Sequence, residues 1–84
     1  MGPQAFLDEL SKHRATAILR TNDQQKAARA MNAAVAGGFR IVEFTLTVPG
    51  VYELIEEFSA KPGVIVGAGT VLEVEQARLA VRAG

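Results

Sequence analysis

The sequence has no cysteine, and neither sign of charge is in excess. Without cysteine, disulfide bonds and thiolate metal sites are excluded, and a reducing cytoplasm is the expected compartment. Nine basic residues cancel nine acidic residues, and neither kind gathers into a long block. This balance argues against nucleic acid or an anionic membrane surface as the main partner.

Long hydrophobic runs are also missing. No apolar stretch approaches the roughly 20 residues that a membrane-spanning helix needs. The N-terminal sequence MGPQAFLDELSKH has no basic region followed by a long apolar run, so no secretory signal is predicted. What remains is a globular composition, with 49% hydrophobic and 21% charged residues. The 84 residues allow one domain at most, near the size at which a single core becomes marginal.

The hydrophobic pattern predicts an alternation of strands and helices. Expected are a leading helix over residues 4–12 and strands over about 16–20, 40–46 and 64–68, with a helix after each strand. Asn22 or Asp23 can cap the helix after the first strand, and Gly37 and Gly38 can end it. The resulting βαβαβα order predicts an α/β chain with parallel strands.

The predicted helices carry their apolar residues on one face. These residues are Ala27, Ala30, Met31, Ala34 and Val35 in the first crossover helix, Val51, Leu54, Ile55 and Phe58 in the second, and Val74, Ala77, Ala80 and Val81 in the last. Pro49 suits the first turn of the second. Since crossovers are right-handed, all three helices should cover the same face of the sheet and leave the other face bare. Such a chain is either part of a barrel or needs a partner.

A carboxylate stands in the middle of the second predicted strand. Side chains alternate along a strand, so Val42 and Phe44 should face the helices while Glu43 and Thr45 face the opposite side. An ionised carboxylate in a largely buried strand is costly unless a partner or a reaction uses it.

Polar residues at the strand ends are expected on the same face as Glu43. The pattern assigns to this face Thr16, Ile18 and Arg20 of the first strand, Ile41, Thr45 and Thr47 of the second, and Val64, Val66, Ala68 and Thr70 of the third. The C-terminal ends of parallel strands meet at one edge, where active sites of barrel enzymes lie. Glu43, Arg20, Thr45 and Thr70 are therefore expected to converge there.

Structural explanations compete with this functional one. Glu43 can equally be a solvated residue or the salt-bridge partner of Arg20. The segment GAGTVL resembles a phosphate loop, but Leu72 replaces the last glycine of that motif and no Lys-Ser/Thr follows. Its glycines are interpreted as room for backbone to approach backbone or ligand. His13 has no partner histidine or cysteine, so no metal site is predicted there.

Three segments together resemble a known family. AILR, GGFRIVEFTLTVPG and GAGTVL, in this order and spacing, are similar to the 2-keto-3-deoxy-6-phosphogluconate aldolases, also called 4-hydroxy-2-oxoglutarate aldolases. The resemblance covers nearly all of the chain. It implies a (β/α)8 TIM barrel, of which residues 1–84 would be a single partial domain with the leading helix and the first three βα units. It also implies a homo-oligomer, usually a trimer.

The resemblance implies a metal-free class I aldolase that needs no cofactor. In this family a lysine forms a Schiff base with a small 2-keto acid, and cleavage releases pyruvate and an aldehyde. Glu43 matches the carboxylate that shuttles protons. Thr70 matches the threonine that holds the pyruvyl carboxylate, and Arg20 is assigned to carboxylate binding because a guanidinium can grip it bidentately. Thr45 and Thr47 are further substrate-binding candidates, since many members carry an arginine in place of Thr47.

The family's Schiff-base lysine has no counterpart in these residues. It belongs to the sixth strand, beyond Gly84, and the lysines present, Lys12, Lys26 and Lys61, match nothing catalytic. The 84-residue chain alone is therefore expected to be inactive. The alternative hypothesis is a standalone or engineered half-barrel that assembles with copies or a partner and catalyses nothing.

Overall fold

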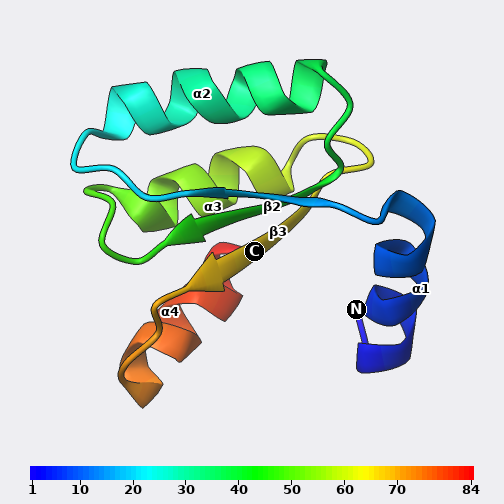
Figure 1. Cartoon of the computed structure of the whole chain (residues 1–84). Coiled ribbons are helices and arrows are strands. Elements are labelled where there is room, and N and C mark those ends of the chain that lie inside the picture. The colour runs from blue at the N-terminus through cyan, green and yellow to red at the C-terminus, as the bar shows by residue number, and fades with distance from the viewer.

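The computed structural model describes all 84 residues as a parallel sheet of three strands with four helices (Figure 1). In chain order the elements are α1 Pro3–His13, β1 Thr16–Leu19, α2 Gln24–Ala36, β2 Ile41–Thr45, α3 Val51–Ser59, β3 Ile65–Gly69 and α4 Val74–Ala83. The strands lie in the order β1-β2-β3, with β2 in the centre. This confirms the α/β class and is consistent with part of a βα-repeat fold. None of the helices has the length and apolarity to span a membrane.

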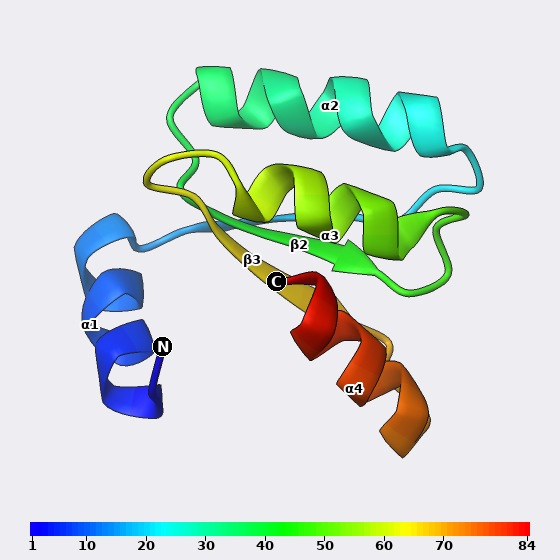
Figure 2. The same cartoon turned by 180° about the vertical axis from the view of Figure 1, so that it is seen from behind.

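Helices α2 and α3 lie side by side over one face of the sheet, here called the covered face (Figures 1 and 2). The buried core between them and the sheet consists of Ala27, Met31, Val42, Phe44, Val48, Val51, Leu54, Ile55 and Phe58. The rings of Phe44 and Phe58 meet edge to face with centroids 5.2 Å apart, a favourable geometry for aromatic rings. The opposite side of the sheet is here called the open face.

Helix α2 begins and ends at the residues whose chemistry favours helix ends. The Asp23 carboxylate accepts a hydrogen bond from the backbone N–H of Lys26 at 3.0 Å, which satisfies one free donor of the first turn. This hydrogen bond is the main reason why the pKa of Asp23 lies below its ordinary value. At the other end, Gly37 is the C-cap and Gly38 takes a φ of +116°, which a side chain would disfavour. Within α2, Ala30 is exposed and does not contribute to the apolar stripe as expected.

Helix α3 has the apolar face that the sequence predicts, since Val51, Leu54, Ile55 and Phe58 are all buried. Its start differs from the expectation for Pro49, which precedes the helix and does not lie in its first turn. Gly50 turns the chain with a φ of +65° and serves as the N-cap, and its carbonyl accepts a hydrogen bond from Gln24 at 3.2 Å. The left-handed turn at Gly50 delays the helix to the next residue.

The expected apolar face of α4 is largely exposed. Ala80 and Ala83 pack against the core, but Val74 and Val81 are 70% and 80% exposed. In Figures 1 and 2, α4 runs alongside β3 at the outer edge of the sheet. β3 is the last strand in the sheet order, so no further strand lies beneath the outer side of α4. Helix α1 stands apart at the end where the strands begin (Figure 2).

Candidate functional site

The open face of the sheet carries the candidate site, and the strand register determines its composition. Ile18 of β1, Glu43 of β2 and Gly67 of β3 are aligned neighbours. Two residues further along each strand, toward the C-terminal edge, Thr45 is aligned with Gly69. Directly aligned residues of parallel strands share a face, so the open face runs from an apolar side chain on β1 through a carboxylate to a strand with no side chains at these two positions.

The prediction for β3 was wrong in its choice of face. Val64, Val66 and Ala68 were expected beside Glu43, but they pack against the core on the covered face. The register explains this, because Val66 is aligned with Val42 and Ala68 with Phe44. Of the β3 residues that share the open face with Glu43, only Ile65 therefore has a side chain. The other two are Gly67 and Gly69.

Thr70 nevertheless reaches the open face, by a change in backbone conformation. Continued alternation from Ala68 would direct it toward the helices. Instead it adopts a φ of +57°, and its hydroxyl accepts a hydrogen bond from a guanidinium nitrogen of Arg20 at 2.8 Å. A β-branched residue in the left-handed region is rare and costs on the order of 1–3 kcal/mol. The strained turn is thus what brings the Thr70 hydroxyl to the site.

Arg20 follows the last residue of β1, so its bond to Thr70 links the C-terminal ends of the two outer strands across β2. The alternative in which Arg20 pairs with Glu43 is not what the structure contains. The chain has two ion-pair contacts, one between His13 and Glu9 and one between Arg78 and Glu75, and neither involves the site. Arg20 is exposed, and its charge is not neutralised by a carboxylate of this chain.

The Glu43 carboxylate lies over the bare backbone of β3. A Cβ atom built on Gly69 would overlap its Oε1 atom and come within 3.2 Å of its Cδ atom. Glu43 is half-buried and forms no ion pair within the chain. Beside it, Thr45 is only 4% exposed, and its hydroxyl shares a hydrogen bond of 2.8 Å with that of Thr47. The structure therefore places Glu43 and Thr45 against β3, next to the joined pair Arg20 and Thr70.

The site is an open surface in this chain. None of the four surface cavities is lined by Glu43, Arg20, Thr45, Thr47 or Thr70. The largest, of about 640 Å³, extends from the start of α1 along β3 as far as Gly67, the aligned neighbour of Glu43. The candidate site is therefore identified by its polar groups and not by a cavity.

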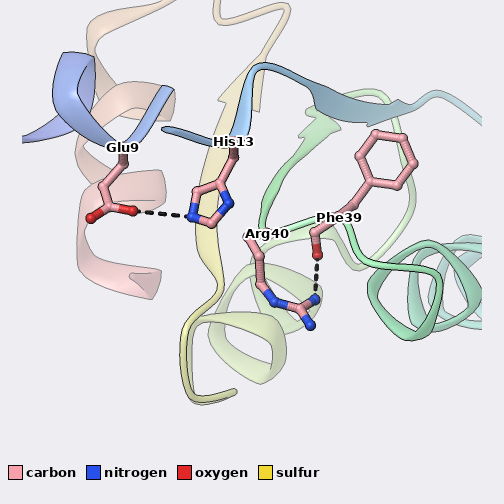
Figure 3. A network of polar contacts seen from close by, with 4 residues as sticks. All are labelled: Glu9, His13, Phe39 and Arg40. Carbon is pink, nitrogen blue, oxygen red and sulfur yellow. Dashed lines mark hydrogen bonds and ion pairs between the residues drawn. The ribbon is translucent and has the colours of Figure 1, made fainter. Parts of the chain in front are cut away.

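Polar contacts at the N-terminal end of the strands have a structural character. Figure 3 shows His13 with its Nε2 atom 3.2 Å from a carboxylate oxygen of Glu9, one helical turn earlier. It also shows Arg40, which donates to the carbonyl of Phe39 at 2.8 Å; Arg40 also donates to the carbonyl of Val35 at 2.9 Å. No group of three or more metal-binding side chains lies together in the structure.

Residues 7–84 match the family model described as KDPG and KHG aldolase. The chain belongs to this aldolase family. It is also similar to a 2-dehydro-3-deoxy-phosphogluconate aldolase of Zymomonas mobilis, with 39% identity over 67 residues. The matched region is 80% of this chain and 32% of that enzyme, so the chain spans about a third of the length of the curated relative it matches.

The lysines of this chain all lie off the sheet. Lys12 is on α1 and Lys26 on α2, where both are exposed. Lys61 lies between α3 and β3, with its ammonium 5.1 Å from the ring centroid of Phe58. No lysine therefore extends from a strand onto the open face, where Glu43 lies.

Sequence reasoning missed Gly69 as a member of the site. It interpreted the glycines of GAGT as general room for backbone or ligand, without connecting either to Glu43. A signal was present, because Gly67 and Gly69 are two residues apart and so share one face of the strand. The strand adjacent to a long carboxylate therefore has no side chain at two successive positions on the same face.

Proposed function

We propose that this chain supplies the acid–base carboxylate and the keto-acid binding edge of a class I aldolase built as a trimeric (β/α)8 barrel. The enzyme would be an aldehyde-lyase that cleaves 2-keto-3-deoxy-6-phosphogluconate or 4-hydroxy-2-oxoglutarate to pyruvate and an aldehyde. One observation carries the proposal. The Arg20–Thr70 hydrogen bond of 2.8 Å lies at the same strand edge as the unpaired Glu43 carboxylate.

Arg20 and Thr70 would hold the carboxylate of the 2-keto acid. The guanidinium keeps further N–H donors beyond the one given to Thr70, and its charge has no carboxylate partner in the chain. Hydrogen bonds from an ionised donor to a carboxylate are about twice as strong as neutral ones. Thr70 can turn its hydroxyl from acceptor to donor when a carboxylate arrives, and Thr47, exposed beside Thr45, offers a second hydroxyl.

Glu43 would move the protons of the reaction. A lysine from the rest of the barrel adds to the keto carbon, and loss of water from the resulting carbinolamine gives an iminium. Removal of the proton from the C4 hydroxyl breaks the C3–C4 bond, which releases the aldehyde and leaves an enamine. Protonation of the enamine and hydrolysis then release pyruvate. Glu43 can serve each proton transfer through water because its carboxylate is not engaged in an ion pair.

The decisive experiment replaces Glu43 in a hybrid enzyme, in which this segment is joined to the remaining two thirds of the Zymomonas mobilis aldolase. Glu43→Gln keeps the size of the side chain but removes its basicity. The turnover number kcat should fall by about 10² to 10⁴ while the protein stays folded. Glu56→Gln, which changes an exposed carboxylate on α3, is the matched control and should retain activity.

Either of two results would count against this role for Glu43. Near-normal turnover of Glu43→Gln would mean that proton transfer runs through another group. Loss of folding in Glu43→Gln, judged by circular dichroism against Glu56→Gln, would identify Glu43 as a structural residue.

A second candidate function is a half-barrel that assembles with copies of itself and catalyses nothing. Exposed apolar residues favour it, since Ile18 on the open face, Leu72 in the loop before α4 and Val81 on α4 are each more than half exposed. For the 84-residue chain, sedimentation should show a dimer or larger species. Borohydride reduction with pyruvate should leave Lys12, Lys26 and Lys61 unmodified. A folded monomer would contradict the assembly, and a stoichiometric adduct on one of these lysines would contradict the missing nucleophile.

A further inference from the structure

Gly69 lies closer to the Glu43 carboxylate than Gly67, the other glycine of β3. A Cβ atom at Gly69 would overlap Oε1 of Glu43 and lie 3.2 Å from its Cδ, so the space that a side chain would take is occupied by the carboxylate. Gly69 has an ordinary extended backbone, and a positive φ does not explain the glycine there. The three atoms nearest to the added Cβ all belong to Glu43, and none belongs to Thr45, the aligned neighbour of Gly69.

Gly67 offers an internal comparison on the same strand and face. A Cβ atom there would lie 3.9 Å from the carbonyl oxygen of Val42 and 4.0 Å from Cγ of Glu43, which is ordinary van der Waals contact. Two glycines two residues apart thus differ in what they leave room for. Gly67 tolerates an added methyl group, whereas Gly69 does not as long as the Glu43 carboxylate keeps its place.

We propose that Gly69 is a positioning residue that fixes the Glu43 carboxylate at the C-terminal edge of β3. The inference rests on the proposed function, in which this carboxylate transfers protons. With no ion pair to hold it, the carboxylate depends on the shape of its surroundings. The bare backbone at Gly69 lets it lie flat against β3, one residue from the Thr70 hydroxyl that accepts from Arg20.

An added methyl group would push the carboxylate away from this edge. Displacing a reacting group by about 1 Å can cost on the order of 10²-fold in rate. Gly69→Ala in the hybrid enzyme should therefore lower kcat by about 10- to 100-fold. The Michaelis constant should change little, because Arg20 and Thr70 are untouched. Gly67→Ala is the matched control, with the same added atoms on the same face, and should keep kcat within about twofold.

A double-variant cycle separates action through Glu43 from action on the fold. Combining Gly69→Ala with Glu43→Gln should cost little beyond Glu43→Gln alone, because the proton transfer is already lost. Multiplying losses would mean that Gly69 acts independently of Glu43 and would overturn the inference. Equal effects of Gly69→Ala and Gly67→Ala would overturn it as well. If Glu43→Gln were itself fully active, the proposed function would fail first, and the two failures are thus distinguishable.

A structural measurement on the 84-residue chain tests the same geometry without activity. Nuclear Overhauser contacts between the γ protons of Glu43 and the α protons of Gly69 should be present in the unaltered chain and in Gly67→Ala. They should be lost in Gly69→Ala. Their absence from the unaltered chain, with the β2–β3 backbone contacts intact, would overturn the inference even if the hybrid enzyme failed to fold.

Discussion

The two faces of β2 differ in how deeply their side chains are buried and in the kind of side chain they carry. On the covered face, Val42 and Phe44 are fully buried under α2 and α3. On the open face, Glu43 is half-buried between Ile18, which is 61% exposed, and the bare backbone of Gly67. One strand of five residues thus contributes the centre of the core and, at alternate positions, the centre of the candidate site. Core residues and candidate-site residues therefore alternate along one strand, so we expect substitutions on one face to leave the other face largely unchanged.

The largest effect should follow from breaking the covered face. Phe44→Ala removes a fully buried ring that meets Phe58 edge to face. A loss of about 3 to 5 kcal/mol is expected, which is a large part of the stability of so small a chain. Urea denaturation of the 84-residue chain measures it. Ile18→Ala on the open face is the counterpart and should cost well under 1 kcal/mol in the same chain, because its side chain stays in water on folding. Similar losses in the free energy of unfolding for the two variants would contradict the difference between the two faces.

A smaller effect should follow from altering the open face without removing charge. Arg20→Lys keeps the positive charge but not the planar fork that can grip a carboxylate. In the hybrid enzyme the Michaelis constant for the keto acid should rise about tenfold, with kcat nearly unchanged. Arg29→Lys on the exposed side of α2 is the control and should change neither constant. A fall in kcat alone would assign Arg20 to the proton-transfer step and not to binding.

The smallest effect concerns the end of a covering helix and depends on pH. The pKa of Asp23 is lowered from its ordinary 3.8, chiefly by the hydrogen bond from the Lys26 N–H. A lowered carboxyl pKa in the folded state contributes stability that is present above the ordinary value and is lost as the pH falls through the folded value. Asp23→Ala should therefore be less stable at neutral pH, and the difference from the unaltered chain should shrink as the pH falls below the ordinary carboxyl value of 3.8. Urea midpoints across this range measure it, and a difference independent of pH would contradict the charged cap.

The sequence predicted the elements and the covered face because several residues indicate the same structure there. Val51, Leu54, Ile55 and Phe58 recur at helical spacing, and all four are buried. It could not predict the face of β3, because apolar residues occupy both parities of VIVGAG. Only pairing with β2 decides that Val66 joins Val42 in the core. When a strand has apolar residues on both faces, its alternation does not show which face will be buried, because the register with a distant strand decides it.

The meeting of Arg20 and Thr70 at the strand ends was predictable, but the way in which they meet was not. Arg20 and Thr70 were expected at one edge, and they are hydrogen-bonded there. The expectation for Thr70 rested on alternation, however, whereas the structure achieves the contact through a left-handed residue. Threonine disfavours the left-handed conformation, so the local sequence does not predict this turn at Thr70. The exposed face of α4 was missed for a related reason, since amphipathic spacing shows which residues are apolar but not whether anything covers them.

The bond between Arg20 and Thr70 has a consequence for the order of folding. Its partners are 50 residues apart, and they come into reach only after both crossovers have docked and all three strands are aligned. Local contacts within each helix form early, whereas contacts that close long loops must wait for the chain to lose much of its freedom. The edge that holds Arg20 and Thr70 is therefore among the last features to form, and a partly folded chain would carry a nearly complete core without this edge. A ligand that grips Arg20 and Thr70 together would bind only the finished sheet and would draw the folding equilibrium toward it.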